Sequence, residues 1–593
     1  MSLFSDRLDA FLEQFFRLNP VAATAVGSHG HDGDWPDLSE AGRAARLDFA
    51  TRWQTELRAM PNFELSDDDL IDRDLLLSEL AAMRFEDTDL REGAWDALGY
   101  VYLLGGGIFP LMAREFAPLA TRLSSVASRL EGVRPLVMEA RRELGSVPSR
   151  PVSQLHLDMA RKQLPGIVAL IEDAVDQAEA AVDQPGVAEL LPRLRAAAAD
   201  AIDAIARLDR HFQDSYVRSE GDGRLGPELF AAKLRHTLRS DLTGDEILAQ
   251  ANVEYGAVRA EMIRIARAIW SDWVPGEQLP TAASEGGQDA AYSRTVAAVT
   301  EAIGRAHHPA AQLVEYCRES YRGIVEFCRS HDVISVPDEP LEIDWTPPFL
   351  REYAGAMLDS PGPLDKGQKT FYFVTPPPDE WSAEQVESFL AEENDRQIDL
   401  TTIHEGSPGH YLQLVYSNRC PSLARAVFGS GGFIEGWAVY VTQVMMDLGF
   451  KADDPALMLI HWKFYLRAIT NAMIDVGIHA GSMTEAEAMD LMVRGGFQEE
   501  SEARKKWDRA RLTSTQLSTY FVGSMEMWRL ERERRERAAV AAGDPRGAAA
   551  VPEPRVVGGF GETPGFSYKE HLESVIAHGS PPMPLIRRIL LGE

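Results

Sequence analysis

The chain has 593 residues, of which 45% are apolar and 25% charged, a composition typical of a globular protein with a large core. It carries 91 acidic against 60 basic residues, a formal net charge of −31. A field of this sign repels phosphate backbones and anionic lipid surfaces, so we expect neither nucleic acid nor membrane among its partners.

The cysteines and the N-terminal residues indicate in which cellular compartment the protein is expected. Three cysteines are too few, and odd in number, for a disulfide framework, so we interpret Cys317, Cys328 and Cys420 as core thiols in a reducing compartment. The first residues lack the basic region and apolar run of a signal peptide. No run approaches the ~18–20 apolar residues that cross a bilayer. These observations predict a cytoplasmic protein.

The first predicted helix begins at Ser5 or Asp6 and stops before Pro20, because its apolar residues recur at steps of three and four. The following segment, Gly27–Asp34, contains two histidines and two aspartates. We interpret it as an exposed polar loop, with a metal site as the alternative. From about 38 to 330 the pattern is helical, and one apolar stripe between Leu190 and Phe212 indicates a core-facing helix.

The pattern changes near residue 335. Segments 341–345 and 369–375 read as strands of a small sheet within a mostly α protein. Prolines 376–378 follow the second segment and suit an edge strand, which could receive an extended peptide by strand addition; an ordinary hairpin is the alternative. We therefore predict a helical N-terminal lobe, 1–335, and a C-terminal lobe, 336–593, within one structural unit.

Helices resume at about 382, and one of them leads directly into His404. We interpret 428–432 as the turn into the next helix and not as a serine nucleophile, because it lacks the spaced-glycine elbow. Residues 531–557 are rich in Arg, Glu and Ala, then in Pro and Gly, and are expected to form a charged helix end and a mobile loop.

The segment His404-Glu405-Gly406-Ser407-Pro408-Gly409-His410 carries the chemistry, together with Glu435 further on. Two imidazoles and a carboxylate are the ligand set of a catalytic zinc, and a Glu beside the first His is the usual base. On a regular helix, however, histidines six residues apart lie about 240° apart around the axis. We therefore predict that the glycines and the proline break the helix and turn His410 back towards the metal. The alternative is a kinked helix with structural histidines.

The segment His-Glu-Gly-x-Pro-Gly-His, followed by Glu-Gly-Trp-Ala-x-Tyr at 435–440, resembles the bacterial family called domain of unknown function 885. The likeness runs through most of the chain. The family in turn resembles the helical gluzincin metallopeptidases, such as carboxypeptidase Taq and the neurolysin-like oligopeptidases. The resemblance implies a two-lobed helical metallopeptidase-like fold with a deep cleft and the small sheet near the active site. This chain departs from the family pattern at Tyr411, at Thr442, and at Ser514-Thr515, where Pro-Gly is usual before Gln516.

Roles follow for individual residues. His404, His410 and Glu435 are predicted to bind one zinc per chain, and Glu405 to act as general base. Asp475 or Asp399 could orient the imidazoles. The remaining candidates are catalytic or substrate-binding: Tyr520 and His479 as stabilisers of the oxyanion, and Arg509, Gln516 and Tyr372 as contacts to substrate. For Tyr520 and His479 a core position is the alternative.

These roles predict a zinc-dependent peptide hydrolase, a carboxypeptidase or an oligopeptidase, that acts on short peptides. A zinc amidase on a peptide-like small molecule is the alternative within enzymes. A catalytically silent binding protein is the alternative outside them, and a homodimer is left open.

Overall fold

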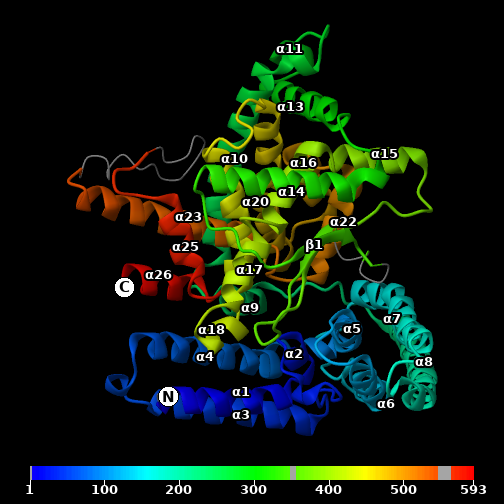
Figure 1. Ribbon diagram of the computed structural model, residues 1–593. Coiled ribbons are helices and arrows are strands. Elements are labelled where there is room, and N and C mark those ends of the chain that lie inside the picture. The colour runs from blue at the N-terminus through cyan, green and yellow to red at the C-terminus, as the bar shows by residue number, and fades with distance from the viewer. Residues whose placement is uncertain (1–2, 348–350, 352–354, 545–561, 593) are drawn as a thin grey trace.

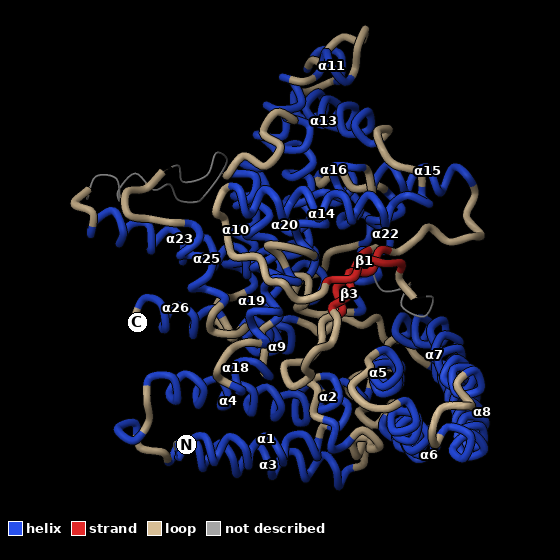
Figure 2. The backbone as a smooth tube through the Cα atoms, viewed as in Figure 1, coloured by secondary structure: helices blue, strands red, loops and turns tan. Residues whose placement is uncertain are grey.

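The computed structural model describes residues 3–347, 351, 355–544 and 562–592. Helices make up 71% of the chain and strands 3%, so the prediction of a mostly α protein with a small sheet is confirmed. Figure 2 shows the strands as one short patch among the helices. Part of the predicted mobile loop at 531–557 lies outside the described residues, and its first part belongs to a long helix.

The first helices form a layer at the lower edge of Figure 1. Phe11 and Phe16 are buried in their common core, together with Phe428 from a distant part of the sequence. The rings of Phe11 and Phe428 lie 6.1 Å apart, so this layer is attached to the C-terminal half. Its helices are α1 (Leu3–Leu18), α2 (Pro20–Ala25), α3 (Glu40–Ala59) and α4 (Asp67–Phe85), with α18 (Leu423–Val427) against them.

A second helical group follows, and it packs around its own core at the lower right of Figure 1. Leu194, Leu208 and Phe212 are buried in this core, which confirms the predicted core-facing stripe. The helices are α5 (Leu98–Ala113), α6 (Leu119–Glu143), α7 (Gln154–Ala180) and α8 (Val187–Arg218).

The largest core includes residues from both sides of position 335, so the predicted lobes share it. Its helices before that position are α9 (Pro227–Leu238), α10 (Gly244–Ala268), α11 (Trp270–Trp273), α13 (Gln288–Gly304) and α14 (Leu313–Ser330), with the short α12 (Ala282–Glu285) beside α13. Those after it are α16 (Asp395–Glu405), α17 (His410–Asn418), α19 (Gly431–Asp447), α20 (Pro455–His479), α23 (Ser518–Ala541), α25 (Tyr568–Ile576) and α26 (Met583–Leu591). Two smaller cores hold α15 (Ala383–Glu392), which packs with the sheet, and α21 (Glu485–Met489) with α22 (Glu500–Leu512).

Helices α19 and α23 touch backbone to backbone. A Cβ atom on Gly436 would lie 2.3 Å from the carbonyl carbon of Gly523, and one on Gly523 would lie 2.0 Å from the carbonyl oxygen of Gly432. No side chain fits between these segments, so glycine is required for the helices to approach this closely.

The small sheet has the order β1-β3-β2, from β1 (Leu341–Trp345), β2 (Ala356–Asp359) and β3 (Thr370–Val374). The two predicted strands are present, but β3 is the central strand and pairs in parallel with β1 and antiparallel with β2. Its backbone is therefore occupied on both sides, and the predicted edge for an extended peptide is wrong at this strand. The two predicted strands do not form a hairpin with each other, because they are parallel, whereas β3 pairs antiparallel with the preceding strand β2, as the hairpin alternative expects.

The loop at 27–34 is anchored and not simply exposed. His29 binds Asp32 through Nδ1 and Asp365 through Nε2, each at 3.0 Å, and its ring stacks on Phe116 at 3.6 Å. The backbone N–H of Leu364 also donates to the carbonyl of Val26 at 3.0 Å. The imidazole therefore joins the N-terminal helices to the segment before β3, and its two nitrogens point to different carboxylates.

The cysteines carry free thiols: Cys317 and Cys328 are buried, whereas Cys420 is only half-buried. Among the helices in the described ranges, none is by itself long and apolar enough to cross a bilayer. One bent pair, residues 67–94 and 98–113 at 106° to each other, satisfies the length and composition that such a crossing needs.

Candidate metal centre

The helix break between the two histidines is confirmed. Helix α16 ends at Glu405 and α17 begins at His410. A Cβ atom on Gly409 would lie 2.0 Å from the carbonyl oxygen of His404, so only glycine lets the chain fold back on the end of α16. The Ser407–Pro408 peptide bond is cis, and the Trp437 indole donates to the Pro408 carbonyl at 2.9 Å.

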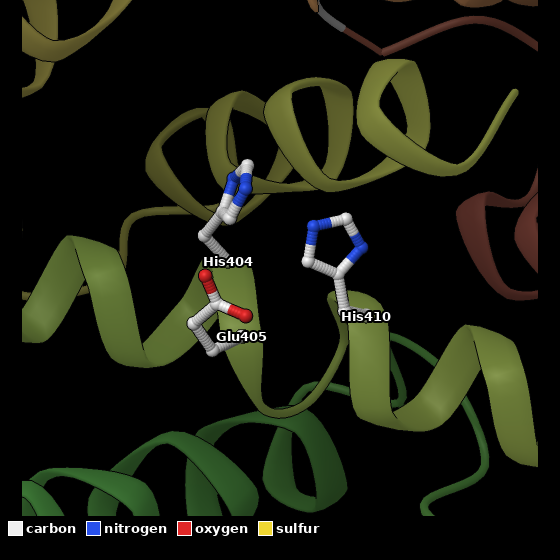
Figure 3. Close-up of side chains that lie close together, drawn as sticks. All are labelled: His404, Glu405 and His410. Atoms are coloured by element: carbon white, nitrogen blue, oxygen red, sulfur yellow. The ribbon is translucent and has the colours of Figure 1, made fainter. Parts of the chain in front are cut away.

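The break brings the two imidazoles together. Figure 3 shows His404 and His410 on either side of the turn, with Glu405 beside them. The rings lie 4.7 Å apart at 82°, and each presents Nε2 to Glu435 on α19. The Glu435 carboxylate oxygen is 3.4 Å from Nε2 of His410 and 3.8 Å from Nε2 of His404.

These separations suit one small cation. Two ligand atoms that each lie ~2.0–2.2 Å from a tetrahedral zinc are roughly 3.4 Å from one another. The nitrogen–oxygen separations are equal to this value or a few tenths of an ångström larger. Two imidazoles and one carboxylate also leave a fourth position free for water or substrate, which is the donor set of a catalytic zinc.

His404 and Glu435 have the charges that a metal ligand needs, whereas His410 must release its proton before it can bind. Burial lowers the pKa of His404 to about 3, so this ring is neutral and free to bind through a lone pair. Burial opposes protonation of His410 as well, but the Glu435 side chain outweighs it and raises the pKa of this imidazole. Burial also disfavours the charge on Glu435, yet His410 and His404 hold its pKa below the usual value, so the carboxylate is ionised.

Glu405 lies beside the ligands without forming an ion pair with them. One ligand atom each from His404, Glu405 and His410 all fall within 4.8 Å of one another. Burial raises the pKa of Glu405 to about 7, against the opposing effect of His410. A carboxyl group with a pKa near neutrality can both accept and return a proton.

The predicted orienting aspartates are elsewhere. Asp399 binds Ser320 and Lys451, and Asp475 accepts hydrogen bonds from the backbone N–H groups of Thr515 and Ser518. Within the described part of the chain, Nδ1 of neither imidazole has a hydrogen-bond partner. The proposal of Asp475 or Asp399 as a partner of the ligands is therefore wrong.

Tyr520, Arg509 and Gln516 form a hydrogen-bonded cluster near Glu435. The phenol oxygen accepts from the Arg509 guanidinium at 3.3 Å and from the Gln516 amide at 3.2 Å, so its own proton is available to a further acceptor. Burial and then the charge of Glu435 raise the pKa of Tyr520 to about 12. Arg509 in turn helps to keep the pKa of Glu435 low. Three residues predicted from sequence therefore lie together beside the candidate centre.

The backbone before this cluster is unusual, as the missing Pro-Gly indicates. Thr515 has φ 69°, a left-handed conformation that is costly for a β-branched residue. Asp475 accepts the Thr515 N–H at 3.0 Å, and the Thr237 hydroxyl lies 2.7 Å from the Thr515 hydroxyl. These contacts hold the strained residue in place.

His479 does not face the centre. Its Nε2 lies 2.7 Å from the Ala510 carbonyl, and its Nδ1 accepts from the Leu225 N–H at 3.4 Å. The ring stacks on Phe230 and is 1% exposed. Both nitrogens are occupied by backbone, so His479 is a core histidine that positions the end of α22 and not a catalytic group.

Tyr372 is also a core residue. It is 1% exposed, and its hydroxyl lies 3.3 Å from that of Thr402 on α16, two residues before His404. It cannot touch a substrate in this position. The assignment to substrate binding is therefore wrong, and Tyr372 instead connects β3 to the helix that carries the first ligand.

Sequence reasoning missed Lys506, one turn before Arg509 on α22. Burial and the charges of Arg509 and Arg467 lower its pKa well below the usual value, while Glu502 and Glu435 act in the opposite sense. Among the residues described, no acceptor lies within hydrogen-bond distance of its ammonium group. A run of Lys and Arg on a helix reads as a solvated face, so the sequence gives no signal for this residue.

A profile of the family "Bacterial protein of unknown function (DUF885)" matches residues 20–590, nearly the whole chain. The chain belongs to this family. The DUF885 assignment agrees with the motifs around His404 and Glu435, and the family description itself names no activity. A comparison with curated proteins finds no match.

Two solved structures show the same fold. One is described as "a putative lipoprotein of unknown function" from Shewanella oneidensis, with 27% identity, a TM-score of 0.79 and full coverage of both chains (100% and 100%). The other, described as "the putative lipoprotein" from Colwellia psychrerythraea, has 15% identity and a TM-score of 0.76, covering 99% of this chain and 98% of that one. This DUF885 chain therefore shares its full-length architecture with both.

Proposed function

We propose that this protein is a zinc-dependent hydrolase of peptide bonds in short peptides. The observation that carries the proposal is the convergence of two imidazole Nε2 atoms on one Glu435 oxygen, at 3.4 and 3.8 Å. A second carboxyl group, Glu405, lies beside them without an ion pair. A site that only binds metal has no need of that group, whereas hydrolysis needs a base.

Each residue of the site has a task in this chemistry. His404, His410 and Glu435 would hold the zinc, which when bound supplies a Lewis acid for activating water and polarising a carbonyl. Glu405 would accept the proton of the attacking water and return it to the leaving nitrogen. Tyr520 would donate its free proton to the carbonyl oxygen as negative charge develops there.

The substrate contacts follow from the charges beside the site. Arg509 donates only to neutral partners, Gln516 and Tyr520, and Lys506 has no acceptor in the described ranges. A guanidinium with only neutral partners, beside an amine whose charged form a bound carboxylate would favour, suits an anionic group on the substrate, and a peptide supplies one at its C-terminus. The deep cleft stays a prediction, because the zinc ligands line neither the cavity beside Leu238 and Gly523 nor the one beside Glu86 and Ser430.

The proposal is tested with wild type, Glu405→Gln and His404→Ala, and with Glu384→Gln as a control on the exposed start of α15. Metal content is measured by mass spectrometry, and cleavage of a short-peptide mixture by chromatography. We expect about one zinc per chain in wild type, Glu405→Gln and Glu384→Gln, and none in His404→Ala. Cleavage should fall by about 10²–10⁴-fold in Glu405→Gln and be unchanged in Glu384→Gln.

The outcomes separate the alternatives. Wild-type protein without zinc, purified without chelator, would contradict the metal site. Equal cleavage by wild type and Glu405→Gln would remove Glu405 from the mechanism. Zinc without hydrolysis of any peptide would favour the silent binding protein, and hydrolysis confined to non-peptide amides would favour the amidase.

Location belongs to the same proposal. The sequence predicts a cytoplasmic protein, but two relatives of the same fold are described as putative lipoproteins, a class anchored outside the cytoplasm. We propose an extracytoplasmic location for this chain as well. Fractionation of the native host, with detection by an antibody, distinguishes the two locations. A signal confined to the cytosolic fraction would contradict the extracytoplasmic location and support the cytoplasmic one.

A further inference from the structure

A cavity of about 250 Å³ lies between α4, α9 and the turn that begins α19. Its walls include apolar side chains from Phe85 and Pro582 and charged ones from both α4 and α9. None of the predicted site residues lines it. The volume accommodates a molecule of several heavy atoms together with its water.

One end of the cavity is the start of α19, which has no cap. Ser430 occupies the N-cap position, yet its side chain accepts no N–H of the helix. Within the described residues, the N–H groups of Gly431, Gly432 and Phe433 have no acceptor. The first N–H groups of a 17-residue helix carry partial positive charge and favour an anion.

Ser430 gives a second and independent indication. Ser430 is 7% exposed and lines the cavity. No described residue forms a hydrogen bond with its hydroxyl group. This hydroxyl group is open to the cavity, so a ligand atom there would complete its hydrogen bond.

The groups on the other walls suit a cation beside an anion. Arg239 binds Glu79 at 2.9 Å and Lys233 binds Glu92 at 2.9 Å, so both cations are neutralised. Glu86 lines the same cavity, and its carboxylate has no ion pair or hydrogen bond among the described side chains. Burial and the charge of Glu92 raise the pKa of Glu86 to about 7, so a bound ammonium group would favour the charged form of this unpaired carboxyl group, which faces the same space as the uncapped helix.

We propose that this cavity binds a small zwitterion, an amino acid or a dipeptide, with its carboxylate at Ser430 and the α19 N–H groups and its ammonium at Glu86. The apolar walls suit an aliphatic side chain. Binding does not depend on the proposed hydrolase activity.

The cavity is bordered by two helices that are connected to the metal centre. Helix α19, which it would cap, carries Glu435 five residues after Ser430. Helix α9 contacts the segment before Tyr520 through Lys233 to the Ser514 hydroxyl at 2.8 Å and through Thr237 to that of Thr515 at 2.7 Å. If the protein hydrolyses peptides, the zwitterions are its own products, and the site is suited to respond to them.

Calorimetric titration of the full chain tests the site. The ligands are leucine and glycyl-leucine, which distinguish an amino acid from a dipeptide. Three further compounds carry charge of one sign only: N-acetyl-leucine and inorganic phosphate are anions, and leucinamide is a cation. We expect at least one zwitterion to bind at least tenfold more tightly than all three single-charge probes. Glu86→Gln and Ser430→Ala should each weaken it at least fivefold, whereas Glu228→Gln, an exposed matched change on α9, should not.

His404→Ala separates this site from the metal centre. Binding should persist in that variant, and its loss would assign the titrated site to the metal centre and overturn the proposal. Absence of binding by both zwitterions at millimolar concentration would also overturn it. So would binding of phosphate that Glu86→Gln leaves unchanged, which indicates a plain anion site. Melting temperatures of each variant show whether it is folded, and a folded Glu86→Gln that binds as wild type contradicts the proposal by itself.

Discussion

Tyr520 offers a proton that its neighbours do not use, since Arg509 and Gln516 both donate to its oxygen. We predict that Tyr520→Phe lowers kcat about 10²–10³-fold, the usual cost of losing one donor to a developing oxyanion. Zinc content should be unchanged, because the phenol is not a ligand. Tyr416→Phe, which removes a hydroxyl that bonds the Ser335 carbonyl at 2.9 Å, is the control and should retain activity.

Lys506 and Arg509 lead to a prediction about substrate. A peptide with a free C-terminal carboxylate should be cleaved at least tenfold faster, in kcat/KM, than the same peptide as an amide. Lys506→Met should reduce that preference mainly through KM, because it removes an amine that a bound carboxylate would hold in its charged form in ground and transition state alike. Equal cleavage of acid and amide by wild type would contradict this role while leaving the zinc mechanism intact.

Much of the metal centre could be predicted from the sequence because a local signal determines it. The glycines and the proline between His404 and His410 predict the break in the helix, and the break determines the direction of the second imidazole. The errors at His479 and Tyr372 have another origin. Each lies on a correctly predicted helix or strand, but which face of that element turns to the core depends on distant partners such as Ala510 and Thr402.

The turn between α16 and α17 is packed so closely that it has no room for a side chain at Gly409. A methyl group at Gly409 would meet the carbonyl oxygens of His404 and Ile403, which cannot move without unwinding α16. We predict that Gly409→Ala loses zinc and lowers the free energy of unfolding by roughly 3 kcal/mol or more.

Gly256→Ala is the matched control for that substitution. A Cβ atom at Gly256, within α10, would meet nothing within 4 Å. Alanine there should stabilise the protein by about 0.5–1 kcal/mol. Zinc content and thermal unfolding are the measurements, and a Gly409→Ala protein that keeps both would contradict the geometry of the turn.

The sheet shows where prediction from pattern fails. Strands β1 and β3 are alternating or β-branched and aromatic, and their ranges were predicted. Strand β2, Ala356–Asp359, has four residues and no such signal, and it is the strand that makes β3 central. Register and order depend on which segments meet in space, so the edge position was predicted from the prolines alone and was wrong.

His29 joins distant parts of the chain, and its contribution to the free energy of unfolding depends on pH. Burial disfavours its charge, but hydrogen bonds to Asp32 and Asp365 outweigh this and raise the pKa to about 9, from an ordinary value near 6.5. A raised pKa in the folded state stabilises the fold fully below pH 6.5, and the stabilisation is lost as the pH rises through 9.

We therefore predict that His29→Gln costs about 1–3 kcal/mol at pH 6, with allowance for solvent screening, and much less at pH 9.5. Urea unfolding across this range measures the difference from wild type. His331→Gln, an exposed histidine without a carboxylate within ion-pair distance among the residues described, should show no such trend. A His29→Gln penalty that stays constant with pH would exclude the ion pair as its source.

The overall arrangement could be predicted only in outline. Helical periodicity identifies the first helix, the core-facing stripe between Leu190 and Phe212 and a largely helical chain, and these give the fold class. The packing of α1 and α18 in one core, through Phe11 and Phe428, joins segments about four hundred residues apart, and no local pattern specifies it. The boundary at 335 remains a prediction, and the largest core crosses it.

The glycine contact between α19 and α23 has a consequence for the reach of the metal centre. Glu435 directly precedes Gly436, and Tyr520 lies one turn before Gly523, so a metal ligand and the phenol are carried by two backbones in direct contact. The spacing of the two backbones that carry these side chains is therefore fixed by their direct contact. A side chain at either glycine would push the metal ligand and the phenol apart, so the geometry of the centre depends on two missing methyl groups.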